Sequence, residues 1–156
     1  MPFTACIAGR ILCMHGGLSP KMKDMNSLRN IQRPAEPKGA SLELDLLWAD
    51  PDETAEGWQE NSRGVSFVFG PDMLTHMCKK LGVDLIARGH QVVQDGYEFF
   101  GNRQLVTIFS APHYCGQFDN AAATMNVAED LTCSFHASVS NCFLKKVLPT
   151  RKVEKH

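Results

Sequence analysis

The chain lacks several features that would assign it to a special class of protein. It has no internal repeat and no apolar run near the roughly 18 residues that a membrane-spanning helix needs. Its N-terminal segment is apolar but has no basic start, so we expect no signal peptide. Its formal net charge is only −1, which argues against a dedicated nucleic-acid-binding protein. We therefore expect neither a nucleic-acid nor a membrane partner, and local arginines must supply any attraction for phosphate.

The cysteines also lack a pattern, because the six of them are scattered and form no C-x-x-C pair. A disulfide framework is typical of shorter, secreted chains. We expect reduced and mostly buried thiols, and hence a protein of the cytoplasm or the nucleus. With 156 residues, of which 44% are hydrophobic, the chain can form one domain with a core.

The hydrophobic pattern predicts α/β structure first and antiparallel β structure afterwards. A strand pair that turns at Gly9 and Arg10 is expected over 3–14. Further strands are expected over 85–87, 96–100, 105–109, 124–127 and 131–137, with a turn at 101–102. Helices are expected over 27–31 and over 71–81, where Pro71 begins the second helix and Gly82 ends it. Residues 42–48 are expected to form one helical turn, and 49–64 a long polar loop.

Three apolar strands end in residues that can carry chemistry. ILCMHGG delivers His15, VDLIARGHQ delivers Arg88 and His90, and LVTIFSAPHYCGQFDN delivers Tyr114. α/β enzymes place their active-site loops at such strand ends. Imidazole suits transition-metal ions, and the arginine fork matches phosphate oxygens. The three strand ends therefore predict a metal-assisted site for an anionic substrate.

Each of these residues also has a purely structural interpretation. His15 alone is more often a polar residue in a glycine-rich turn. Arg63, in ENSRGVSF, can equally form a surface ion pair, and Arg88 can form a structural salt bridge with Asp50 or Asp84. The sequence leaves these alternatives open. Tyr114 in turn can be a core aromatic residue whose hydroxyl is hydrogen-bonded.

Longer motifs give the chain a resemblance to one family. HGGLSP, LLWADPD, GW-x-EN-x-RGVSF-x-FG, ARGHQVV-x-DGYEFF, LVTIFSAP-x-YCG-x-FDNA and CSF resemble the second half of the phosphoprotein phosphatase catalytic domain, most of all its type 1 members. The resemblance covers 1–137, and the remaining residues, 138–156, are expected to form a basic tail. It implies an α/β fold of the calcineurin-like metallophosphatase type, here the second half of an αββα sandwich.

The resemblance also implies an activity. Members of the family hydrolyse phosphoserine and phosphothreonine in proteins with a hydroxide activated by two divalent metal ions, manganese or an iron and zinc pair. It implies that His15 and His90 bind the same metal ion and that Arg63 grips the substrate phosphate. Tyr114 would line the site, and Asp50 would be an acid lying behind it.

The chain departs from the family pattern in two ways. His113, Gln117, Ser62 and Gly89 stand where the family usually has Asn, Glu, Asp and Ala. The family's first-half motifs GD-x-HG, GD-x-x-DRG and GNHE do not occur. We therefore expect a chain that begins within the domain, keeps at most one weak metal site and is by itself inactive or nearly so.

A non-catalytic function is the alternative. Type 1 phosphatases dock RVxF-type peptides of regulatory subunits by strand addition in an apolar groove. Such a chain could bind regulatory subunits without acting on phosphoprotein substrates. The positions of this chain that match the groove are Ile11, Leu85, Phe99, Leu131, Cys133 and Phe135. These six side chains can also simply fill the core of the sandwich.

Overall fold

The computed structural model describes residues 1–139, which form two compact units. Unit 1 contains residues 1–91 and 98–107, and unit 2 contains residues 92–97 and those from 108 onward. Among the described residues, no helix is long and apolar enough to cross a membrane. The five described cysteines are all free thiols, as expected, but the expectation that most are buried is wrong, because only Cys78 is buried while Cys6 and Cys115 are exposed.

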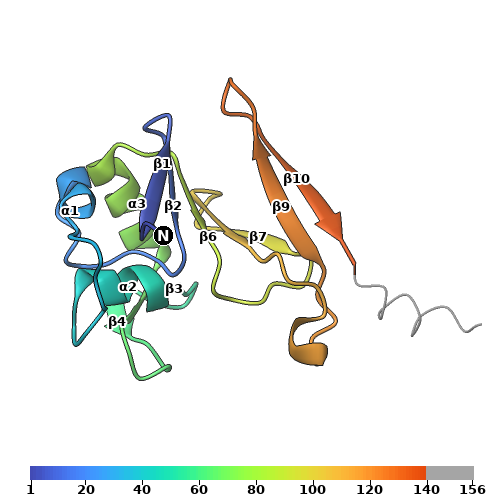
Figure 1. Ribbon diagram of the computed structural model, residues 1–156, viewed down its shortest axis with the longest axis horizontal. Helices are drawn as coiled ribbons and strands as arrows, with labels where there is room; N and C mark the ends of the chain where they lie inside the picture. Colours follow the sequence, from blue (N-terminus) through green and yellow to red (C-terminus); the bar gives the residue numbers. More distant parts are fainter. Residues whose placement is uncertain (140–156) are drawn as a thin grey trace, which may run out of the picture. The chain divides into compact units, whose positions relative to one another are not determined.

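A five-stranded sheet organises unit 1 (Figure 1). Its strand order is β1-β2-β6-β8-β7, with bounds β1 Thr4–Ile7, β2 Ile11–Met14, β6 Leu85–Arg88, β8 Leu105–Ile108 and β7 Tyr97–Phe100. β1 and β2 form an antiparallel hairpin, whereas β2, β6 and β8 run parallel. Parallel strands bring their carboxyl ends to one edge of a sheet. The residues that follow β2 and β6, which include His15 and His90, therefore meet at that edge.

Three helices and a small second sheet complete unit 1. The helices are α1 Met25–Arg29, α2 Leu42–Trp48 and α3 Pro71–Leu81, and the second sheet has the order β3-β5-β4, with β3 Asp50–Pro51, β5 Phe67–Phe69 and β4 Trp58–Glu60. α3 has proline in its first turn and ends at Gly82 in the left-handed conformation, as its sequence predicts. The core contains fully buried side chains from β2, α2, β5, α3, β6 and β8, namely Leu12, Leu46, Phe69, Leu74, Ile86 and Leu105.

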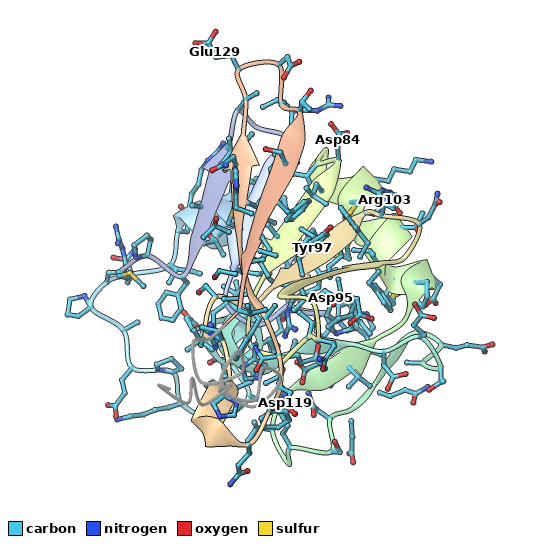
Figure 2. All side chains as sticks on the ribbon, turned by 90° about the vertical axis from the view of Figure 1, so that its right-hand side faces the viewer. Asp84, Asp95, Tyr97, Arg103, Asp119 and Glu129 are labelled. Carbon is cyan, nitrogen blue, oxygen red and sulfur yellow. The ribbon has the colours of Figure 1, made fainter. Side chains whose placement is uncertain are left out.

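Unit 2 is built on a long antiparallel hairpin of β9 Ala122–Val127 and β10 Cys133–Ser138 (Figure 1). Tyr97 stacks on Phe135 with ring centroids 4.1 Å apart. Figure 2 shows Glu129 at the tip of this hairpin and Asp119 at the opposite end of the unit, in the loop after the short 3₁₀ helix η1, Tyr114–Gly116.

The α/β fold predicted from the sequence is confirmed, and two local expectations are wrong. Residues 49–64 are not one loop, because they contain β3 and β4, and α2 spans seven residues rather than one turn. Ser41 stabilises the first turn of α2 by accepting a hydrogen bond from the backbone of Leu44 at 3.1 Å. Most of the expected basic tail, from residue 140 on, lies outside the described residues.

Candidate functional site

The structure brings His15 and His90 together at the sheet edge. Nε2 of His15 lies 3.2 Å from Nδ1 of His90, and the two rings meet edge to face. Two nitrogens that each bind one tetrahedral ion at about 2.1 Å are about 3.4 Å apart. The observed separation is therefore close to the one that a shared metal ion requires, and these two nitrogens fit such an ion.

Backbone contacts fix this approach. The N–H of Gly89 donates to the carbonyl of His15 at 3.1 Å, which ties the two strand ends together. A Cβ on Gly16 would lie 2.4 Å from the backbone carbon of Leu47, so only glycine lets the His15 loop lie this close to α2. His90 has a φ of +68°, a strained conformation for a histidine. Strain of this kind is often found at functional sites.

Asp50 lies behind the histidines and accepts several hydrogen bonds. Its carboxylate accepts from Nε of Arg63 at 2.7 Å, from Nη2 of Arg88 at 2.8 Å and from Nδ2 of Asn61 at 3.0 Å. Burial opposes ionisation of Asp50, but the hydrogen bonds from Asn61, Arg63 and Arg88 outweigh it and hold the pKa of Asp50 below its ordinary value. The cluster pairs two arginines with one aspartate, which leaves it one positive charge in excess.

Arg88 connects three parts of the site from within. Its side chain is wholly buried and also donates to the carbonyls of Gly16 at 2.6 Å and Ala49 at 3.1 Å, and to Oε1 of Gln91 at 2.7 Å. Burial lowers the pKa of Arg88 to about 10, so it remains a cation at neutral pH. Of the two salt bridges considered from the sequence, Arg88 forms the one with Asp50, while Asp84 pairs with Arg10.

Arg63 differs from Arg88 because it reaches solvent. Its side chain is 36% exposed, and only its Nε is engaged, by Asp50. Within residues 1–139 its two terminal amino groups make no hydrogen bond. This arrangement presents the fork of the guanidinium to an incoming anion while Asp50 fixes its orientation.

Both histidines favour the neutral form that a metal ion needs. Burial and the positive charges of Arg63 and Arg88 lower the pKa of His90 to about 4, against the opposing charge of Asp50. Burial and the charge of Arg88 likewise lower the pKa of His15. Nε2 of His90 is buried, has no hydrogen-bond partner in the described part of the chain and lies 4.0 Å from Oδ1 of Asp50. A carboxylate on the far side of a ligand histidine is a common arrangement in metal sites.

The ligand set is incomplete. No three His, Cys, Asp or Glu side chains gather in a metal-binding group anywhere in the described residues. His15 and His90 thus offer two ligands, whereas protein sites for transition metals commonly use three or four. The expectation of at most one weak metal site stays a prediction.

Tyr114 belongs to unit 2, so its expected place beside the histidines stays a prediction. Its side chain is partly exposed, with 42% of the residue accessible, and its backbone N–H donates to Oδ1 of Asn120 at 3.0 Å.

The residues expected to form the peptide groove divide between the two units, with Ile11, Leu85 and Phe99 in unit 1 and Leu131, Cys133 and Phe135 in unit 2. Their role in peptide docking is likewise a prediction.

The sequence interpretation missed Asn61 and Gln91. Asn61 is buried and donates through one amide group to Asp50 and to the Trp48 carbonyl, while its Oδ1 accepts from the backbone of Arg63 at 3.0 Å. It thereby fixes the start of the loop that carries Arg63. The only signal in the sequence is its position two residues before that arginine.

The fold and this cluster define the class of protein. The sequence profile of the calcineurin-like phosphoesterases matches residues 1–94, and the chain belongs to that family. It is similar to the serine/threonine-protein phosphatase PP1-delta of Caenorhabditis elegans, with 59% identity over 135 residues, which cover 86% of this chain and 44% of the relative. The predicted calcineurin-like fold and the predicted resemblance to phosphoprotein phosphatases are both confirmed.

A solved structure supports the same assignment. A protein serine/threonine phosphatase from Saccharomyces cerevisiae, described as similar to human phosphatase PP5, superimposes with a TM-score of 0.82 at 29% identity. The match covers 90% of this chain and 47% of that protein. The chain thus spans about half the length of each of these two relatives.

Proposed function

We propose that the chain carries part of the active site of a protein serine/threonine phosphatase. The observation that carries this proposal is the 3.2 Å approach of His15 to His90 beside Arg63, which is oriented by Asp50. The similarity to PP1-delta supports phosphoserine and phosphothreonine in proteins as the substrate class. The free cysteines are consistent with a location in the cytoplasm or nucleus.

The residues have separate roles in this proposal. His15 and His90 hold one divalent ion, manganese, iron or zinc, which when bound supplies Lewis-acid stabilisation of the phosphoryl charge. Arg63 binds the phosphoryl oxygens through its free fork and stabilises the charge that they carry in the transition state. Asp50 and Arg88 do not touch substrate but hold Arg63 and the two strand ends in place.

The isolated chain should nevertheless turn over very slowly. Its described residues supply two metal ligands, and the first-half motifs that carry the general acid in the family do not occur in its sequence. General-acid catalysis alone contributes about 10²–10⁴-fold. We expect manganese-supplemented protein to hydrolyse para-nitrophenyl phosphate far below the roughly 1–10³ per second of ordinary enzymes. A turnover number within that range would contradict this expectation.

Binding rather than turnover therefore tests the proposal. Calorimetric titration with inorganic phosphate, in the presence of manganese, should show saturable binding by the wild type. Arg63→Met should weaken it about tenfold or more, since a hydrogen bond to a charged group contributes about 1.5–3 kcal/mol. Arg29→Met, which removes an exposed arginine from α1, is the matched control and should bind like the wild type. Equal binding by all three proteins would place the anion elsewhere.

A second candidate function is the docking of RVxF-type peptides. β9 and β10 form a two-stranded sheet, so within residues 1–139 β10 pairs on one edge only. Cys133 and Phe135, half-buried and two residues apart, share one face of β10. An added strand would gain backbone hydrogen bonds at the open edge and specificity from that face.

A labelled RVxF peptide tests this candidate. Phe135→Ala should lose peptide affinity, whereas Phe118→Ala, at an exposed loop position of the same unit, should not. Circular dichroism must show that both variants keep the β9–β10 hairpin. No binding by folded wild-type protein would remove this function.

A further inference from the structure

The buried carboxylate of Asp45 has no role in the proposed site, but it connects two loops of that site. Asp45, on α2, is only 1% exposed. Its Oδ2 accepts from Oγ of Ser19 at 2.6 Å and its Oδ1 from Oγ of Ser66 at 2.8 Å. Nζ of Lys21 lies 3.1 Å from the same Oδ2 and also stands over the ring of Phe67. Both oxygens of this carboxylate are therefore satisfied within the protein, as a buried charge requires.

The two serines belong to the two loops that form the site. Ser19 follows His15 by four residues, and Ser66 follows Arg63 by three. Neither serine lies on the same helix as Asp45, so the carboxylate joins α2 to both loops. A side chain that only stabilised α2 would not need hydrogen bonds to both loops.

The Arg63 loop is held at both of its ends. It connects β4 to β5, and the N–H of Asn61 donates to the carbonyl of Ser66 across its base at 3.4 Å. At its start, the Asn61 side chain donates to Asp50 at 3.0 Å. At its end, Ser66 has a φ of +63°, which is strained for a serine, and its hydroxyl donates to Asp45. The bond to Asp45 thus stabilises a conformation that Ser66 would otherwise leave readily.

We infer that Asp45 is a positioning residue that sets the guanidinium of Arg63 relative to His15 by anchoring Ser66 and Ser19 to α2. This inference rests on the proposed function, because it gives Arg63 the task of binding phosphate. Asp45 itself reaches neither the anion nor the metal ligands. Without it, the Ser66 end of the loop loses its side-chain anchor, and Arg63 loses its fixed orientation on Asp50.

The test follows Arg63 directly through the nitrogen-15 resonance of its Nε–H group. In wild-type protein this group donates to Asp50, so its exchange with water should be slow. Asp45→Asn and Ser66→Ala should each speed that exchange and weaken the binding of inorganic phosphate about tenfold, the effect of one lost buried hydrogen bond. The Nε–H of Arg88, which donates to Gly16, serves as an internal reference in Ser66→Ala, where the bond between Ser19 and Asp45 is kept, and should not change there.

Two control variants separate positioning from general destabilisation. Asp95→Asn makes the same chemical change at an exposed position, and Leu74→Ala opens a cavity in the core of unit 1. Neither should alter the Arg63 signal, even if Leu74→Ala lowers stability more than Asp45→Asn does. An unchanged Arg63 signal in Asp45→Asn overturns the inference, as does an equal change in Leu74→Ala. If wild-type protein binds no phosphate but the Arg63 signal still responds to Asp45→Asn alone, the proposed function fails and the positioning role stands.

Discussion

Asp50 accepts a hydrogen bond of 2.8 Å from Arg88, whose side chain is wholly buried. Arg88 has no second carboxylate partner within the part of the chain that the structure describes. The remaining acceptors of Arg88 are two backbone carbonyls and the side-chain oxygen of Gln91. Arg88 therefore depends on Asp50 alone for a counter-charge within the described residues.

Asp50→Asn should accordingly destabilise the protein strongly. The change leaves the charge of Arg88 buried without a counter-charge, which typically costs about 3–5 kcal/mol. Urea unfolding followed by tryptophan fluorescence measures this loss. Asp84→Asn is the matched control, at the position labelled in Figure 2. It removes the carboxylate of an exposed ion pair with Arg10. Exposed pairs contribute about 0–1 kcal/mol, so equal losses for the two variants would contradict this account of Arg88.

The two histidines should bind one transition-metal ion together. Titration with cobalt, followed by its visible absorption, should show a single site in the wild type. His15→Asn or His90→Asn should weaken binding more than tenfold, because even the loss of a supporting residue costs about 10–100-fold in metal affinity. His76→Asn removes an exposed histidine from α3 and should leave binding unchanged. If all three substitutions weakened cobalt binding equally, His15 and His90 would not form a shared site.

Metal-free protein should lose stability as the pH falls from about 6.5 to 4. The pKa of His90 is about 4 in the folded protein, against an ordinary value of 6.5. In that window the unfolded chain binds a proton at this residue and the folded chain does not, so acid favours unfolding. The full effect is on the order of 3 kcal/mol.

Urea unfolding at several pH values, with a chelator present, measures this dependence. His90→Asn suits the left-handed backbone of residue 90 and cannot titrate in this window. As the pH falls from 6.5 to 4, the unfolding free energy of the wild type should therefore decrease more than that of the variant. Parallel pH profiles for the two proteins would show that His90 titrates normally.

Much of this arrangement is readable in the sequence because it depends on local pattern. The ends of α3 follow from Pro71 and Gly82, and the meeting of His15 with His90 follows from parallel strands that share an edge. The small sheet was not predictable, since β3 has two residues and β4 has three, too few to show alternation. The contacts of Asp45 were missed for a different reason. They join residues 21 and 26 positions apart, and only the folded chain brings these together.

Gly16 offers a last test of how the His15 loop is held. In Gly16→Ala the new Cβ would lie 2.4 Å from the backbone carbon of Leu47, and a backbone atom cannot rotate away as a side chain can. The loop must therefore move off α2, at a cost of about 3 kcal/mol, and carry His15 away from His90. Gly9→Ala is the control, because Gly9 has a positive φ of 70° but open space around it. It should cost only about 1–2 kcal/mol of unfolding free energy and leave cobalt binding intact. If Gly16→Ala binds cobalt as well as Gly9→Ala does, the close approach of this loop to α2 does not place His15.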